Sequence, residues 1–282
     1  MRYIIYYKRS KKIVENVIKK MSCKYPLIVS DEDFASIAVG QNIILKCILI
    51  YDILESPICS NKDKIGETHF TSGPLHIFEK KMNGSLHDLI NKCDKVIIPD
   101  FGSDKANLVY VGPIVREIKS GRNRLRSNLG LTRKTILVCA GGTDAGRYLI
   151  KKSLEAYEKL KKRFDIDLIL VSGPNLKFVS DQFHNLGFIN NLHEYIYASD
   201  LVISLAGRST IDESNVYGTP GIFIPIKNHF EQERNAISFG YKYEDISNLE
   251  RLIVEKLGFT RINIASSSRG AEMAVKIISE FL

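Results

Sequence analysis

The sequence predicts an α/β protein built from two doubly wound parallel sheets. Short runs of β-branched and aliphatic residues alternate with longer amphipathic segments through most of the 282 residues, as they do in repeated β-α units. Several of these runs are continuously apolar, which is typical of strands covered on both faces. The strands expected from this pattern comprise residues 2–7, 27–30, 43–50, 95–99, 108–112, 135–140, 167–172, 201–204 and 221–225.

Helices are expected between most of these strands and at the C-terminus. In residues 146–164 the apolar side chains fall on one helical face. An apolar face also runs along residues 268–282, formed by Met273, Ala274, Ile277, Ile278 and Phe281. We expect this last helix, within residues 266–282, to pack back on the first domain, because its apolar face would otherwise be exposed to water.

Residues 118–133 separate the two expected domains. The segment is polar and basic, contains glycine and lacks an apolar stripe, which indicates a solvated linker. A basic strip that faces phosphate or lipid is the alternative. The first domain then comprises residues 1–117, and the second comprises residues 134–265.

Composition limits the classes of partner and metal site. The net charge of +8 favours an anionic partner without identifying it. The five cysteines form no Cys-x-x-Cys pair and the six histidines are scattered, so we expect reduced thiols and no metal. No apolar run reaches the roughly 18–20 residues that span a bilayer, and the N-terminus lacks the order of a secretory signal. We therefore expect a cytoplasmic protein.

A glycine-rich turn after the strand at residues 135–140 is the clearest candidate site. Gly141 and Gly142 let the backbone approach a ligand closely, and Thr143 adds a hydroxyl donor. The helix that follows offers free N–H groups and the positive end of its dipole, which together favour a phosphate. A tight turn with Thr143 or Asp144 as an N-cap is the alternative. A dinucleotide site is disfavoured, because the next strand ends in the neutral sequence VSGP, where an acidic residue would hold the ribose.

The next strand–helix unit adds a carboxylate at the same edge of the sheet. Gly207 lies in a tight turn, and Ser209 and Thr210 stand at the start of a short helix. Glu213 follows in its first turns, where a carboxylate suits the hydroxyls of a ribose or sugar. Alternatively, the polar side chains here complement the helix dipole.

Together with the later stretch HFEQERNA, which contains Glu231 and Gln232, these segments resemble the donor domain of glycosyltransferase family 28 across residues 108–240. Four features match in order: the glycine turn with its hydroxyl residue, Gly-Phe-Ile, Gly-x-x-Thr-x-x-Glu and Gln-x-x-Asn-Ala. The family includes the bacterial enzyme that adds N-acetylglucosamine to lipid-linked muramyl-pentapeptide, and eukaryotic and archaeal enzymes that add it to dolichol-linked sugars. The resemblance implies the GT-B fold, with two Rossmann-like domains, and an inverting, metal-independent transferase.

The resemblance also implies which residues contact a UDP-sugar donor. By this resemblance, the diphosphate is contacted by Arg116, Gly142 and Thr143, and the uracil edge by the backbone of Ile189. The ribose is contacted by Glu213, and the donor sugar by Glu231 and Gln232. The turns and the helix start beside them complete the predicted donor set with Gly141, Gly207, Ser209 and Thr210. No cofactor beyond the UDP-sugar substrate and no nucleic-acid partner is expected.

The first domain departs from the family, because the Gly-x-Gly-His loop that opens its acceptor side is missing. We therefore expect this domain to be shortened. Three explanations of the missing loop are possible: a partner subunit that supplies the missing units, a pared-down fold, and a degenerate copy that only binds the donor. A UDP-sugar epimerase on the same fold is an alternative function. The base that deprotonates the acceptor is expected among Asp31, Asp33, Asp52 and His69. Asp31 and Asp33 follow a strand, where an N-cap pair is the competing interpretation.

Residues 8–24 carry seven basic side chains against one acidic side chain. Ile13, Val14, Val17, Ile18 and Met21 form a helical stripe within them. A core-facing helix with a solvated basic side is the default expectation. An interfacial helix on anionic lipid is the alternative, and it would suit a peripheral protein with a lipid-linked acceptor.

Overall fold

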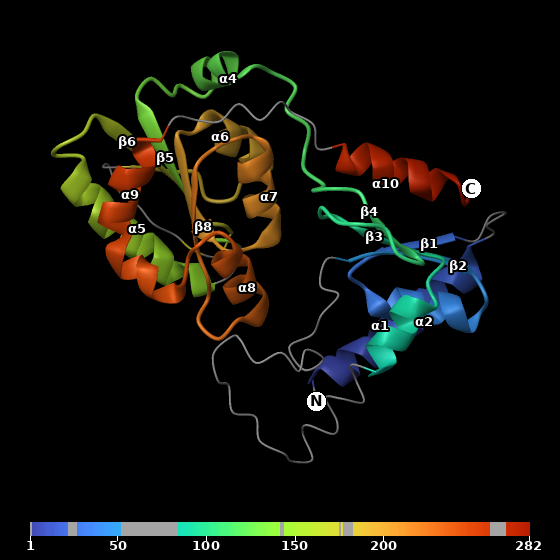
Figure 1. The fold of residues 1–282 in the computed structure, drawn as a ribbon. Coiled ribbons are helices and arrows are strands. Elements are labelled where there is room, and N and C mark those ends of the chain that lie inside the picture. The colour runs from blue at the N-terminus through green and yellow to red at the C-terminus, as the bar shows by residue number, and fades with distance from the viewer. Residues whose placement is uncertain are drawn as a thin grey trace. The chain divides into compact units, whose positions relative to one another are not determined.

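The structure, a computed structural model, describes residues 2–21, 27–51, 84–141, 144–174, 176, 183–259 and 269–282. The chain divides into two compact units, one formed by Met1–Ile114 together with Arg269–Leu282 and the other by Val115–Ser268 (Figure 1). Each unit contains one parallel sheet whose two faces pack against helices. The predicted α/β class with two parallel sheets is confirmed.

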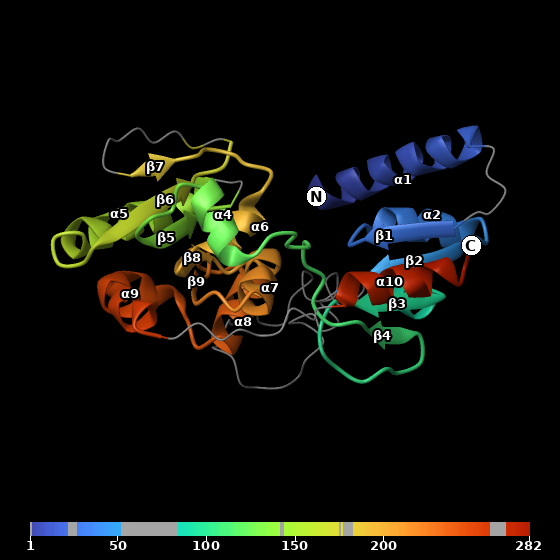
Figure 2. The ribbon, with the colours of Figure 1, turned by 90° about the horizontal axis from the view of Figure 1, so that it is seen from above.

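The first unit holds a four-stranded sheet in the order β1-β2-β3-β4, parallel at each pairing. The strands comprise Leu27–Asp31, Lys46–Ile50, Lys95–Ile98 and Leu108–Tyr110. Successive side chains of β2 face opposite sides. Cys47 and Leu49 pack with helix α2 (Phe34–Asn42), and Ile48 packs with helix α10 (Gly270–Ser279). The last helix of the chain therefore covers one face of the first sheet, as Figure 2 shows.

The expected strand at residues 2–7 is wrong. Helix α1 runs through Arg2–Lys20 as one element and contacts α2. Neither glycine nor proline occurs before Pro26, so a helix that forms in the second half of this segment propagates to its start. Ile5 and Tyr6 consequently lie exposed on a helix, and Tyr7 packs against the core beneath α2.

The second unit holds a five-stranded sheet in the order β7-β6-β5-β8-β9, also parallel throughout. These strands comprise His184–Asn185, Ile166–Val171, Lys134–Cys139, Leu201–Leu205 and Gly221–Ile224. One face packs on α5 (Arg147–Leu160) and α9 (Leu249–Leu257), and the other packs on α6 (Leu192–Ala198) and the end of α7 (Arg208–Val216). The unit also contains η1 (Asp144–Gly146), α8 (Phe230–Ser238) and η2 (Tyr243–Asn248). Because β5 lies between β6 and β8, the strand order reverses there, and ligands of open parallel sheets bind at such a point.

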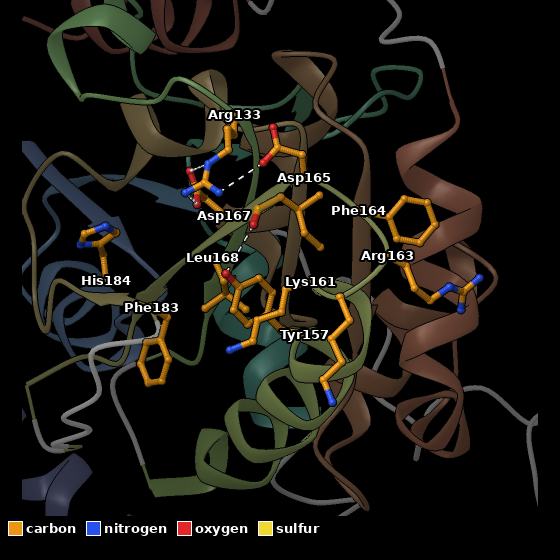
Figure 3. Close-up of a pocket in the computed structure, with 12 residues that line it drawn as sticks. Arg133, Tyr157, Lys161, Arg163, Phe164, Asp165, Asp167, Leu168, Phe183 and His184 are labelled. Carbon is orange, nitrogen blue, oxygen red and sulfur yellow. Dashed lines mark hydrogen bonds and ion pairs between the residues drawn. The ribbon is translucent and has the colours of Figure 1, made fainter.

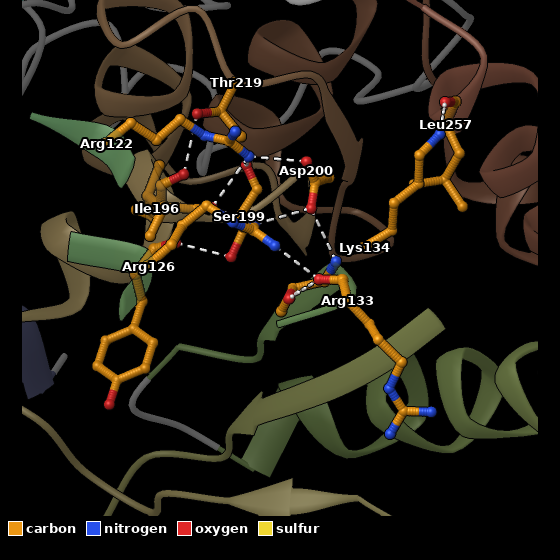
Figure 4. A network of polar contacts seen from close by, with 12 residues as sticks. Arg122, Arg126, Arg133, Lys134, Ile196, Ser199, Asp200, Thr219 and Leu257 are labelled. Atoms are coloured by element: carbon orange, nitrogen blue, oxygen red, sulfur yellow. Dashed lines mark hydrogen bonds and ion pairs between the residues drawn. The ribbon is translucent and has the colours of Figure 1, made fainter. Parts of the chain in front are cut away.

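The predicted linker, residues 118–133, is instead part of the second unit. Helix α4 (Arg122–Asn128) lies within it and contacts α6, with Leu125 buried. Arg122 and Arg126 donate to the carboxylate of Asp200, which also accepts the backbone N–H of Thr135 (Figure 4). Ion pairs, and not an apolar stripe, attach the segment to the sheet. Such pairs leave no periodic pattern in the sequence, so the segment looks like a linker.

Candidate functional site

The candidate site lies at the carboxyl edge of the second sheet, where β5 and β8 diverge. Gly141 follows β5 with a φ of +72°, which glycine adopts without strain. At the start of α5, Gly146 leaves no room for a side chain, because a Cβ there would overlap the carbonyl oxygen of Ala140. These two glycines bring the N-terminus of α5 against the end of β5. The predicted residues Gly142 and Thr143 lie outside the described part of the chain.

The start of α7 forms the other side of this edge. Gly207 is its N-cap and supplies no side-chain hydrogen bond. Ser209 is exposed in the first turn, and Thr210 is half-buried. Nδ2 of Asn235 donates to the carbonyl oxygen of Ala206 at 3.2 Å, which holds α8 beside the same turn. Asn235 was not among the predicted site residues, although it is the asparagine of the Gln-x-x-Asn-Ala motif.

Glu213 provides a buried carboxylate on α7, with 7% of its surface exposed. Among the described residues it accepts no hydrogen bond, and it faces Arg116, whose Nε lies 3.8 Å from Oε1. Burial raises the pKa of Glu213, while the charge of Arg116 opposes the rise and Asp212 adds to it. A buried carboxylate without hydrogen bonds is costly to the fold. Such a group at a ligand-binding edge is a candidate functional residue.

Arg116 stands between Glu213 and the segment that leads into α6. Its Nη1 donates to the carbonyl oxygen of Asn190 at 2.9 Å. The side chain of Ile189 packs into the core of this face. Burial lowers the pKa of His193, and Arg116 lowers it further, so the imidazole is neutral at pH 7. The structure thus brings the predicted residues Arg116, Ile189 and Glu213 into one cluster.

The predicted sugar-binding pair lies in the first turn of α8, where both residues are half-buried. The side-chain oxygen of Gln232 accepts the backbone N–H of Ile226 at 3.1 Å. Its amide nitrogen has no partner among the described residues and is therefore the group available as a donor. Glu231 lies beside it in the same turn.

The candidate bases of the first unit separate into two kinds. Asp33 is the N-cap of α2, and its carboxylate accepts the backbone N–H groups of Ala35 and Ser36. Both of its oxygens are engaged, so the structure supports the capping interpretation of Asp33. Asp31 is exposed at the carboxyl end of β1. Asp52 and His69 lie outside the described residues.

A separate hollow of about 660 Å³ lies at the amino edge of β6, away from this cluster (Figure 3). Arg133 lines it and pairs with Asp165 at 3.2 Å and with Asp167 at 2.7 Å. Lys161, also at its rim, pairs with Glu158 at 2.8 Å. Lys162 and Arg163 line it as well, so basic side chains outnumber acidic ones in its lining.

No group of three or more His, Cys, Asp or Glu side chains in the described part of the chain is arranged to hold a metal ion. Within the same part of the chain, no helix is both long enough and apolar enough to cross a membrane.

Comparison with known proteins agrees with this architecture. Residues 135–269 match the model of the glycosyltransferase family 28 C-terminal domain. An uncharacterized glycosyltransferase of Methanopyrus kandleri is 27% identical over 289 residues, covering 93% of this chain and 77% of the relative. The family resemblance drawn from the four motifs is therefore confirmed.

Other curated relatives are matched over less of their length. The UDP-N-acetylglucosamine–N-acetylmuramyl-(pentapeptide) pyrophosphoryl-undecaprenol N-acetylglucosamine transferase of Caldicellulosiruptor saccharolyticus is 27% identical over 236 residues, covering 71% of this chain and 64% of that enzyme. An uncharacterized glycosyltransferase of Methanosarcina acetivorans is 28% identical over 184 residues, and this chain spans 46% of its length.

Solved structures establish the fold. The calicheamicin glycosyltransferase CalG4 aligns with all of this chain and 80% of its own at a TM-score of 0.62 and 12% identity. A putative UDP-N-acetylglucosamine 2-epimerase from Listeria monocytogenes aligns at a TM-score of 0.59 and 15% identity, covering 97% of this chain and 78% of its own. At these identities the likeness concerns the fold alone, and it confirms the predicted GT-B fold.

Proposed function

We propose that this chain transfers N-acetylglucosamine from UDP to a hydroxyl of a lipid-linked acceptor, with inversion at the anomeric carbon and without a metal. The observation that carries the proposal is Glu213, which is 7% exposed and whose carboxylate accepts no hydrogen bond from the described residues. It lies beside Arg116 at the switch point of the sheet that matches the family 28 domain model. A ribose offers two adjacent hydroxyl donors, which would satisfy the oxygens of Glu213. The name of the Caldicellulosiruptor relative, a UDP-N-acetylglucosamine-dependent transferase, supports the choice of donor sugar.

The other predicted donor contacts follow the same edge of the sheet. The turn after β5 and the N-terminus of α5 would receive the diphosphate, because glycine backbone and helix dipole both favour an anion there. The Ile189 backbone would meet the uracil edge. The amide nitrogen of Gln232 would donate to a hydroxyl of the sugar, with Glu231 accepting from another. These contacts would orient the anomeric carbon toward an acceptor.

Transfer requires one bond to form and one to break. The acceptor oxygen attacks the anomeric carbon as a base takes its proton, and the bond to the diphosphate breaks with both electrons leaving on UDP. The N-terminus of α5 would stabilise the charge that develops on the leaving group. Asp31 is our choice of base among the described residues, because Asp33 is held as a helix cap.

Features of helix α1 support the proposal of a lipid-linked acceptor. It carries seven basic residues and one acidic residue, and its exposed apolar side chains include Ile5 at 63%, Tyr6 at 68%, Ile13 at 54% and Val17 at 50%. A basic helix with an exposed apolar strip is suited to lie on an anionic bilayer. We propose that α1 docks the protein on the membrane that carries its acceptor.

Calorimetry with UDP and the full chain tests the donor site. We expect binding that Glu213→Ala weakens by about 1–3 kcal/mol, as for the loss of a charged hydrogen-bond partner. Glu250→Ala is the matched control, since Glu250 lies on α9 and pairs with Lys159 at 3.3 Å. No binding at millimolar UDP would overturn the donor assignment.

Turnover measurements test the donor sugar, the acceptor and the independence from metal. Transfer from labelled UDP-N-acetylglucosamine is compared with transfer from other UDP-sugars, using a lipid acceptor in anionic or in neutral vesicles. Each reaction is run with and without a chelator. A preference for another sugar, or loss of activity with the chelator, would contradict the proposal. A non-catalytic donor-binding subunit is the second candidate, favoured by the capping role of Asp33. UDP binding without turnover, followed by turnover when membrane extract is added, would support that candidate and a partner subunit.

A further inference from the structure

We propose that Tyr217 is a positioning residue of the donor site, which fixes Arg116 so that its guanidinium spans the Asn190 carbonyl and the Glu213 carboxylate. Neither Tyr217 nor this arrangement belongs to the motifs that identify the family domain. The inference rests on the proposed UDP-sugar site and specifies how the nucleoside end of that site is built.

Tyr217 is anchored firmly enough to act as a reference point. It follows α7 directly, is 8% exposed, and packs edge-on against Tyr197 with ring centroids 5.9 Å apart. Its hydroxyl donates to the carbonyl oxygen of Arg116 at 2.7 Å, across 101 residues of sequence. Arg116 is the second residue of the second unit, so this bond fixes the chain where it enters the unit.

The Arg116 side chain is then held at both ends. Its backbone is fixed by the Tyr217 hydroxyl, and its Nη1 is fixed by the Asn190 carbonyl at 2.9 Å. Its Nε stays 3.8 Å from Oε1 of Glu213, which is beyond hydrogen-bonding distance but close enough for charge attraction. Arg116 therefore favours the ionised carboxylate without occupying the lone pairs that ribose hydroxyls would need.

The charged and titratable groups around this cluster keep Tyr217 a donor. Burial raises the pKa of its phenol, and the nearby Glu213 raises it further, while Arg116 opposes the rise. The phenol is therefore protonated throughout the physiological range. The imidazole of His193 is neutral, so it adds no charge that competes with Arg116.

These contacts also refine the expected position of Arg116. The family resemblance implied a place near the diphosphate, but the described contacts put the guanidinium beside Asn190, next to Ile189, and beside Glu213. Those neighbours are the residues proposed to meet uracil and ribose. Arg116 thus belongs to the nucleoside end of the proposed donor site.

The matched control is Tyr241. It is 6% exposed, packs edge-on against Phe223, and its hydroxyl donates to the carbonyl oxygen of Gly221 at 2.9 Å. It therefore loses the same kind of bond on conversion to phenylalanine, but in the core on the opposite face of the sheet from Tyr217. A general loss of stability should affect both variants, whereas a positioning role should affect UDP binding only through Tyr217.

The experiment measures UDP affinity by calorimetry for the full chain and for Tyr217→Phe, Tyr241→Phe, Arg116→Ala and the Tyr217→Phe/Arg116→Ala double variant. We expect Tyr217→Phe to weaken UDP binding roughly tenfold, as loss of a hydrogen bond that holds a charged group would. Tyr241→Phe should bind like the parent. On the Arg116→Ala background, Tyr217→Phe should have no further effect, because it acts through Arg116.

Several results would overturn the inference. Equal UDP affinity for the two Tyr→Phe variants would do so, as would an undiminished effect of Tyr217→Phe on the Arg116→Ala background. Arg116→Ala leaves the buried ring in place, so parent-like UDP affinity in that variant would also refute the link even if Tyr217→Phe did not fold. Failure of the parent chain to bind UDP would overturn both this inference and the proposed function, whereas a parent that binds confines any failure to the role of Tyr217.

Discussion

Removal of the Asp200 carboxylate is expected to destabilise the protein by about 3 kcal/mol. Asp200 accepts from Arg122 at 2.7 Å, from Arg126 at 3.0 Å and from the Thr135 N–H at 2.8 Å (Figure 4). Losing one partner of a buried ion pair costs roughly 3–5 kcal/mol, and the lower end applies because a quarter of the Asp200 side chain is exposed. The lower end is also favoured because Nη2 of Arg122 keeps the carbonyl oxygens of Ala198 and Ser199 as acceptors when Asp200 is removed.

Thermal unfolding followed by circular dichroism measures the effect of Asp200→Ala. For a unit of about 150 residues, about 3 kcal/mol corresponds to a fall of roughly 6–12 °C in the melting temperature. Asp165→Ala is the matched control: its side chain is 78% exposed beside Arg133, so the shift should be no more than roughly 2 °C. Equal shifts for the two variants would refute the reasoning.

The dependence on pH provides a second check. Burial raises the pKa of Asp200, but the Thr135 N–H and the two guanidinium groups outweigh it and hold the pKa below its ordinary value. Such a group stabilises the fold above its unfolded pKa of about 3.9, and the contribution is lost as pH falls through the lower folded value. The stability difference between the parent and Asp200→Ala should therefore persist from pH 7 to about pH 4 and shrink below it. A difference that already disappears at pH 5–6 would contradict this assignment.

Three further changes test separate parts of the molecule. Glu213→Gln should raise stability at pH 7 by roughly 1 kcal/mol while weakening UDP binding. Burial raises the pKa of Glu213, so the carboxyl stabilises the fold in its neutral form, and this contribution is lost as pH rises through the raised pKa. A less stable variant in thermal melts would contradict this. Asp33→Ala should lower stability by about 1 kcal/mol, because Asp33 caps α2, and should change the transfer rate little. Asp31→Ala should lower the transfer rate by roughly 10²–10⁴-fold. The opposite pattern in thermal melts and rate assays would identify Asp33 as the base. Deletion of residues 269–282 should lower the melting temperature and let a dye bind newly exposed apolar surface, because α10 covers one face of the first sheet. An unchanged melting temperature would show that this helix is not docked.

Several features followed from sequence patterns alone. Eight of the nine expected strands overlap observed strands, because alternation of short apolar runs with amphipathic segments is a local signal of β-α units. The apolar face of residues 268–282 indicated a helix, and α10 occupies Gly270–Ser279. The four motifs identified the family because their residue types are set by close backbone approach and ligand chemistry, which leave a trace in sequence.

The tertiary structure decided the features that depend on partners distant in sequence. Residues 2–7 have strand-like composition, yet they continue α1, because helix propagation and contact with α2 outweigh a short local preference. Arg122 and Arg126 look like solvated linker residues until Asp200 is placed beside them. The hydroxyl of Tyr217 meets the carbonyl of Arg116 across 101 residues, and no periodicity records such a bond. Local patterns report which side chains seek burial, whereas the partner that each polar group finds is settled only when the chain has folded.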